Sequence, residues 1–187
     1  MGLIFETVLV AGLFAGYAAL WAIKRRQLIE TTGLDPEVLA KVTSPVQAYF
    51  ARLVRVFTVL VSGLVVLHGF IRIPMGLTAR LALIDNPAFD IAVGVLGVLG
   101  LSVCWLAQRT MRDSWRLGID KENKTPLVTN GIFRLIRNPT YLGLHVVNLG
   151  VWFIWPTAAV GFYAVLFFVV MEIQVRAEEE QFGQASR

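Results

Sequence analysis

Long apolar runs alternate with short polar segments along this chain. Four apolar runs, near residues 3–23, 54–71, 89–107 and 141–175, are long enough to cross a hydrocarbon layer as helices. Such a layer is about 30 Å thick and takes roughly 20 helical residues. The fourth run is too long for one crossing, and Trp155-Pro156-Thr157 near its middle provides a turn, because proline disfavours helix in the preceding residue. The pattern predicts an all-α bundle of about five spans, the last two forming a tight hairpin.

Composition places the chain in the same class. Hydrophobic residues make up 56% of it and charged residues only 16%, and the mean hydropathy is +0.65. These values lie outside the range of ordinary soluble domains. No internal repeat stands out, so residues 1–187 are predicted to form a single integral-membrane domain.

Lysine and arginine are distributed unevenly between the connecting segments. The segments after the first and third predicted spans hold six and seven of them, whereas the other connections and the tail hold two, none and two. Cytoplasmic segments of membrane proteins are enriched in these residues. We therefore expect the N-terminus outside and the C-terminus in the cytoplasm. The net charge of +4 then reflects orientation in an anionic membrane and gives no case for nucleic-acid binding.

Small residues recur on two of the predicted helices. Gly12 and Gly16 form a GxxxG element, and Gly94, Gly97 and Gly100 recur at three-residue spacing. Small residues let membrane helices approach closely, either within one chain or between two copies. Packing within the chain is the favoured interpretation, so we expect a monomer.

Residue types that bind metals are few and scattered. The chain has two histidines and one cysteine, His68, His145 and Cys104, without the spacing of a metal site. We predict no metal site, and Cys104 is expected to be a buried small residue.

The longest polar segment, residues 108–138, carries two local patterns. Arg109, Arg112 and Arg116 fall on one side of a continued helix, where they would contact lipid phosphates or hold an anionic ligand; both interpretations stay open. Further along, an Asn-Gly pair within residues 127–133 predicts a β-hairpin.

Two charged clusters adjoin the last two spans. The first ends in Asn138-Pro139, which predicts a helix start there, because Asn favours the capping position and Pro the first helical one. The amides of a helix start also form a seat for a carboxylate or phosphate. The second cluster places Glu172, Arg176 and Glu179 on one helix face. Acidic groups near a helix C-terminus oppose its dipole, so basic groups from residues 108–138 or a cationic ligand should compensate them.

Together these clusters carry a family resemblance. The first is Gly131-x-Phe133-Arg134-x-x-Arg137-Asn138-Pro139-x-Tyr141-x-Gly143, and the second is Arg176-x-Glu178-Glu179-x-x-Phe182. In this order and membrane context they resemble the isoprenylcysteine carboxyl methyltransferase family and its prokaryotic relatives, and residues 113–120 resemble the stretch that precedes the first motif. The resemblance covers approximately residues 105–182, the expected cofactor-binding part.

The resemblance implies a bacterial inner-membrane enzyme that uses S-adenosylmethionine from the cytosol. The methyl acceptor would be a lipophilic or lipidated molecule reached from the membrane lipids, with a carboxylate favoured. Methyl transfer to a carboxylate needs alignment and partial removal of water, without a metal or a general base. The implied catalytic residues are Arg176, which would orient the acceptor through its planar fork, and Glu179. The implied cofactor-binding residues are Arg137, Asn138, Pro139, Tyr141, Leu142, Glu178 and Glu179.

The sequence departs from the family pattern at Asn138, where histidine is frequent, and at Phe182, where leucine is usual. Two alternatives stay open. One is an NADPH-dependent membrane sterol or enone reductase, although those enzymes resemble longer chains with more spans. The other is a non-catalytic membrane protein that keeps the pocket for ligand binding.

Overall fold

A computed structural model describes residues 3–37, 45–71, 75–81, 87–115 and 128–185. Within them the chain is helical, in agreement with the predicted class. The long elements are α1 (Leu3–Thr32), α2 (Pro45–Val66), α3 (Pro87–Met111), α4 (Pro139–Ile154) and α5 (Ala158–Ala185). The short ones are the π-helical η2 (Leu67–Ile71), which continues α2, and the 3₁₀ turns η3 (Gly76–Thr78), η4 (Arg112–Ser114) and η5 (Gly131–Arg134).

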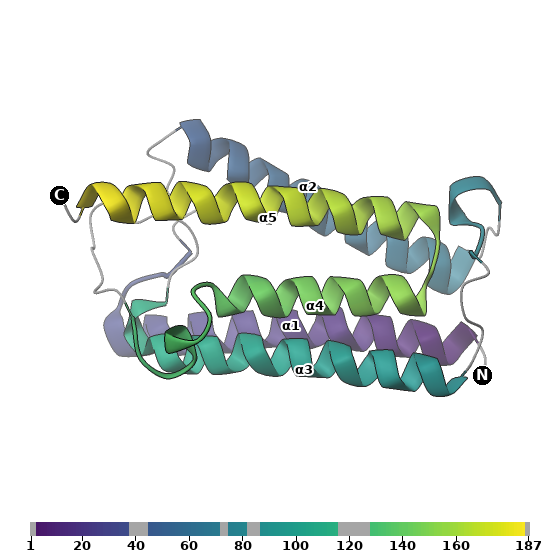
Figure 1. The fold of residues 1–187 in the computed structure, drawn as a ribbon, viewed down its shortest axis with the longest axis horizontal. Coiled ribbons are helices and arrows are strands. Elements are labelled where there is room, and N and C mark those ends of the chain that lie inside the picture. Colours follow the sequence, from purple (N-terminus) through teal and green to yellow (C-terminus); the bar gives the residue numbers. More distant parts are fainter. Residues whose placement is uncertain (1–2, 38–44, 72–74, 82–86, 116–127, 186–187) are drawn as a thin grey trace.

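The five long helices lie lengthwise in one bundle (Figure 1). Helices α1, α3 and α4 contact one another, while α2 and α5 pack together and α5 also contacts α4. The two chain ends lie at opposite ends of the bundle (Figure 1). The α4–α5 turn lies at the same end as the N-terminus, and we call this the turn end. The other end, where α4 begins and α5 finishes, we call the Glu179 end.

Four helices are long and apolar enough to cross a membrane: Ile4–Thr32, Ala48–Ile71, Ala88–Ser114 and Ala158–Arg176. These helices indicate an integral membrane protein. Helix α4 is apolar but has only 16 residues, a rise of about 24 Å, which is short of a full crossing. The fifth crossing therefore stays a prediction. The predicted turn is confirmed, since α4 ends at Ile154 and α5 starts at Ala158.

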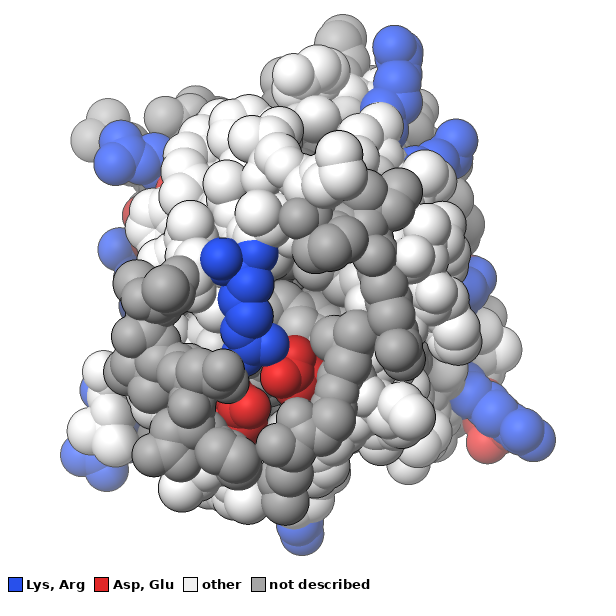
Figure 2. Space-filling view, turned by 90° about the vertical axis from the view of Figure 1, so that its right-hand side faces the viewer, with Lys and Arg blue, Asp and Glu red and all other residues white. Residues whose placement is uncertain are grey.

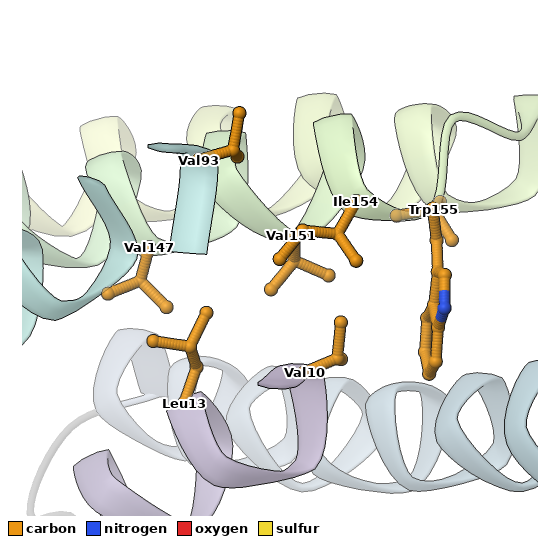
Figure 3. Packing of buried hydrophobic residues seen from close by; sticks show 8 residues of the cluster. Val10, Leu13, Val93, Val147, Val151, Ile154 and Trp155 are labelled. Carbon is orange, nitrogen blue, oxygen red and sulfur yellow. The ribbon is translucent and has the colours of Figure 1, made fainter. Parts of the chain in front are cut away.

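One apolar cluster joins α1, α3 and α4. In Figure 3 the Val147 and Val151 side chains of α4 face those of Leu13 and Val10 on α1. A second cluster joins α2 to α5, and Tyr141 of α4 packs against it. The two clusters fix the position of α4 against α1, α3 and α5. The buried members are Val10, Leu13, Val93, Val147, Val151, Ile154, Trp155 and Val160 in the first cluster, and Phe50, Ala51, Phe57, Tyr163, Val170 and Met171 in the second.

Glycine lets α3 and α4 approach to backbone contact. A Cβ atom at Gly143 would lie 2.6 Å from the Cys104 Sγ and from the Gly100 carbonyl oxygen. A Cβ at Gly97 would lie 2.7 Å from Leu13. These separations are too short for a side chain, so the small residues of α3 serve packing within the chain, as the sequence favoured. Gly12, in contrast, faces open space.

Polar contacts close the turn end of the bundle. Figure 2 shows this face, where acidic atoms lie in a hollow beneath a basic side chain. The buried Glu6 carboxylate accepts two hydrogen bonds of 2.9 Å from Nη1 of Arg80. His68 of η2 bonds Thr157 of the α4–α5 turn at 3.1 Å. The first contact ties the segment before α3 to α1, and the second ties η2 to the α4–α5 hairpin.

Candidate active site

Helix α4 begins at Pro139, with Asn138 in the capping position, as the sequence predicted. The Asn138 side chain, however, makes no capping hydrogen bond. Its Nδ2 instead donates to Glu179 Oε1 at 3.4 Å, across 41 residues of chain. Nε of Arg137 lies 3.0 Å from the same oxygen. The start of α4 and the last turns of α5 are therefore joined through Glu179.

Arg137 supplies the positive charge that the acidic end of α5 requires. The pair is open to solvent, because the Arg137 side chain is 74% exposed and that of Glu179 is 34% exposed. Ion pairs this exposed contribute roughly 1 kcal/mol or less. The contact can therefore rearrange around a ligand at small cost.

The residues that follow line the first turns of α4. Pro139 is buried, Tyr141 is half-buried against the α2–α5 cluster, and Leu142 is exposed. The Leu142 amide donates to the Asn138 carbonyl at 3.1 Å, as the first bond of the helix. A cofactor contact by Leu142 would therefore have to come from its side chain.

Arg176 lies on α5 with an exposed side chain. Within the described residues no ion pair joins it to a carboxylate, although its helix places Glu172 one turn before it. Glu172 instead faces His145 of α4, with Nε2 and Oε1 4.0 Å apart. Glu178 belongs to α5, but its side chain lies outside the described part.

Helices α4 and α5 run antiparallel, and the contacts between them form a register. Asn138 meets Glu179 near the aqueous end, and His145 meets Glu172 seven residues further along each helix. Seven residues of helix rise about 10 Å, so the second contact lies that much deeper. The same register brings Tyr141 and Arg176 to one intermediate level. We call this strip of polar side chains the α4–α5 seam.

Sequence reasoning missed the partnership of His145 with Glu172. Glu172 was recognised only as a member of an acidic helix face, and His145 only as a scattered histidine. The available signal was the seven-residue spacing from Asn138 to His145, which keeps both on one side of α4.

Two predictions for the segment before α4 are wrong. The expected β-hairpin is replaced in its described part by the 3₁₀ turn η5, which starts at Gly131 with a φ of 57°. The expected stripe of arginines is interrupted, because α3 ends at Met111 and Arg112 has a left-handed φ of 48°. Arg116 lies outside the described residues, as does most of the stretch 113–120.

Comparisons with known proteins identify the C-terminal half. A family model described as phospholipid methyltransferase matches residues 89–185, just over half of the chain. The match includes α3, α4 and α5, and hence the whole seam. No curated protein and no solved structure matches. The family is related to the isoprenylcysteine-type membrane methyltransferases that the motifs resemble.

The residues of the seam fit the cofactor of this family, S-adenosylmethionine. That molecule carries an ammonium, a carboxylate and ribose hydroxyls. The partly exposed Glu179 can accept hydrogen bonds from the first and the last, and the guanidinium of Arg137 matches a carboxylate. The chain thus belongs to the phospholipid methyltransferase family of membrane enzymes that use S-adenosylmethionine as methyl donor.

Proposed function

We propose that this protein methylates the polar head of a membrane lipid, within the α4–α5 seam at the Glu179 end. The observation that carries the proposal is the contact of Arg137 and Asn138 with Glu179. It places charged and amide groups from the two residues before α4 and from α5 at one partly exposed point, beside apolar helices. A water-soluble cofactor and a lipid acceptor could meet there.

Cofactor binding is assigned to the outer part of the seam. When bound, S-adenosylmethionine supplies a methyl group on a positively charged sulfur. Glu179 and Arg137 would hold its polar groups, while Asn138 keeps the Glu179 carboxylate in place. Tyr141, Pro139 and Leu142 would form the wall on α4, and Glu178 is assigned to the same site from the motif alone.

The first candidate acceptor is a lipid-borne carboxylate, as in the isoprenylcysteine-type enzymes. Arg176 favours it, since its exposed guanidinium has no ion pair among the described residues and lies level with Tyr141. Its planar fork can orient a carboxylate toward the donor. Alignment and removal of water are then the remaining tasks of the protein.

The second candidate is the amine of a phospholipid head group. The family description names phospholipids, and Arg176 suits a phosphate as well as a carboxylate. The His145–Glu172 contact favours this candidate in particular, because an ammonium requires a negative group nearby and must lose a proton before it can attack. The reductase alternative has no support from the family match.

We also propose that the Glu179 end faces the cytoplasm. The two lysine- and arginine-rich connections both leave the bundle at this end, and such segments are retained on the cytoplasmic side. Five passes of the chain would then place the N-terminus outside.

One labelling experiment tests the proposal and separates the acceptors. Purified protein in lipid vesicles is incubated with radiolabelled S-adenosylmethionine, and the extracted lipids are treated with base. A base-labile label identifies a methyl ester, whereas a base-stable label on an amino-phospholipid identifies an amine. Folded protein that binds no S-adenosylmethionine by calorimetry would instead support the non-catalytic alternative and overturn the proposal.

A further inference from the structure

Two ionisable side chains on the apolar stretches of α4 and α5 face each other. The His145 side chain is only 19% exposed and that of Glu172 is 43% exposed. Glu172 lies within the apolar stretch Ala158–Arg176, one turn before its end. Ionisable groups at such depth are costly, so they usually mark a functional path.

His145 Nε2 is buried and has no hydrogen-bond partner in the described structure. Most buried polar atoms do have one, and the separation of 4.0 Å from Glu172 is too long for a direct hydrogen bond. The atom therefore retains its capacity to accept or donate a proton.

Aromatic rings of α5 hold the imidazole in place. The ring centroid of Phe168 lies 4.7 Å from that of His145, and the ring of Phe167 lies 6.3 Å away in an edge arrangement. Aromatic faces also attract cations, most strongly where water is excluded. The surroundings of His145 thus combine a carboxylate with aromatic rings, a combination that suits an ammonium group.

The other histidine of the chain shows the contrasting arrangement. At the turn end, His68 Nδ1 lies 3.1 Å from the Leu64 carbonyl oxygen, so this nitrogen carries the proton. Its Nε2 lies 3.1 Å from the Thr157 hydroxyl. Both nitrogens of His68 are occupied by structural bonds, whereas Nε2 of His145 is available.

The titratable groups around His145 are few in the described residues. Glu172 on α5 faces the imidazole. On α4, Tyr141 lies one turn nearer the aqueous end, and on α3 the Cys104 thiol is directed to the Thr140 carbonyl at 3.5 Å. Arg176 lies level with Tyr141 in the seam register. Glu172 is thus the charged neighbour that would stabilise a protonated His145.

We propose that His145, supported by Glu172, accepts the proton from the ammonium group of a phospholipid acceptor. This inference rests on the proposed function. The N–H bond of the ammonium breaks and its proton passes to His145 Nε2. The freed lone pair forms the new bond to the methyl carbon, and the electrons of the former carbon–sulfur bond remain on the neutral sulfur. The imidazolium, held by Glu172, later releases the proton to water.

The test compares His145→Gln with the matched control His68→Gln. Both variants are purified and placed in vesicles of phosphatidylethanolamine and phosphatidylglycerol, and labelled lipid is measured as a function of pH. We expect His145→Gln to keep S-adenosylmethionine affinity within about twofold by calorimetry and to lower turnover about 100-fold, the range of lost proton transfer. The rate that remains in His145→Gln should rise steadily with pH, because only acceptor amine that is already neutral can react. The rate of the unaltered protein should instead level off.

The control His68→Gln and a second variant, Glu172→Gln, separate loss of proton transfer from loss of folding. His68→Gln should retain the unaltered pH profile for its folded fraction. Glu172→Gln, at a more exposed position, should lower turnover about tenfold without loss of cofactor affinity, and it serves if His145→Gln does not fold.

The contrary results are equally distinct. A His145→Gln protein with an unchanged pH profile and near-normal turnover would overturn the role of His145. The role of His145 would also be overturned if the unaltered protein binds S-adenosylmethionine but labels lipid only as a base-labile ester. That result would leave the proposed methyltransferase function intact. Absence of cofactor binding would overturn both.

Discussion

The two ends of the bundle use similar polar residues in different ways. At the turn end, the Glu6 carboxylate receives two hydrogen bonds of 2.9 Å from Arg80. His68 and Thr157 meet at 3.1 Å. Each of these side chains has its partner inside the protein, and the two contacts join α1 to the segment before α3 and η2 to the hairpin.

In the α4–α5 seam, at the Glu179 end, the contacts are more exposed or longer: the Arg137–Glu179 pair measures 3.0 Å but is open to solvent. The short pair of Arg25 with Asp35, at 2.6 Å, lies outside the seam. Asn138 reaches Glu179 at 3.4 Å, and His145 stands 4.0 Å from Glu172. Arg176 has no ion pair with a described carboxylate. These groups keep hydrogen-bonding capacity for a ligand.

The comparison teaches that the presence or absence of hydrogen-bond partners distinguishes a structural cluster from a candidate site better than residue type does. Asp90 and Trp155 are exceptions at the turn end, because both are buried and Asp90 Oδ1 and Trp155 Nε1 lack a hydrogen-bond partner in the described structure. Asp90 has a further feature. It lies in the first turn of α3, where the helix dipole stabilises a negative charge. Its position therefore has a local explanation.

The largest expected effect is on catalysis, at Arg176. Arg176→Ala should lower turnover about 100-fold or more, because misplaced acceptor atoms lose alignment with the donor, while S-adenosylmethionine affinity stays within about threefold. Labelled lipid and calorimetry measure the two quantities. Arg80→Ala at the turn end is the control and should keep the activity of its folded fraction. Equal loss of turnover and affinity in Arg176→Ala would place this residue in the cofactor site.

The next effect concerns stability at the turn end. Arg80→Gln leaves the buried Glu6 carboxylate without its cationic partner, so the free energy of unfolding should fall by about 2–3 kcal/mol. Denaturant unfolding in detergent measures this change. The affinity for S-adenosylmethionine in the folded protein should be unaltered. A variant with unchanged stability would show that the Glu6–Arg80 contact does not close this end.

Thr157→Val is expected to have a smaller effect on stability. The hydroxyl contacts His68 and also accepts a hydrogen bond from the Val160 amide at 3.3 Å, so its removal should cost about 1–2 kcal/mol. Thermal unfolding measures the loss. Methyl transfer by the folded fraction should not change, and a selective loss of turnover would contradict the division between the two ends.

The smallest expected change in stability is at Arg137. Its exposed pair with Glu179 should contribute less than about 1 kcal/mol, so Arg137→Gln should unfold almost as the unaltered protein does. If Arg137 helps to hold the donor, the dissociation constant of S-adenosylmethionine should rise at least threefold in calorimetry. A large loss of stability with unchanged affinity would make Arg137 a structural residue.

Much of the fold could be predicted from local patterns. The apolar runs, the turn at residues 155–157 and the start of α4 at Pro139 follow from hydrocarbon burial and from the missing amide of proline. The failures fall between α3 and α4, where composition is mixed. There an Asn-Gly pair suits both a hairpin and a 3₁₀ turn, and Arg112 adopts a backbone conformation that its own side chain disfavours.

By itself the sequence determined the membrane class, the helices and the charged clusters at the ends of α4 and α5. Only the tertiary structure decided which charges meet. Glu179 could have paired along its own helix with Arg176, yet it contacts Asn138 and Arg137 on another helix. The physical reason is that periodicity fixes the face of a helix, whereas the register between two helices depends on how the hairpin and the glycine contacts pack them together.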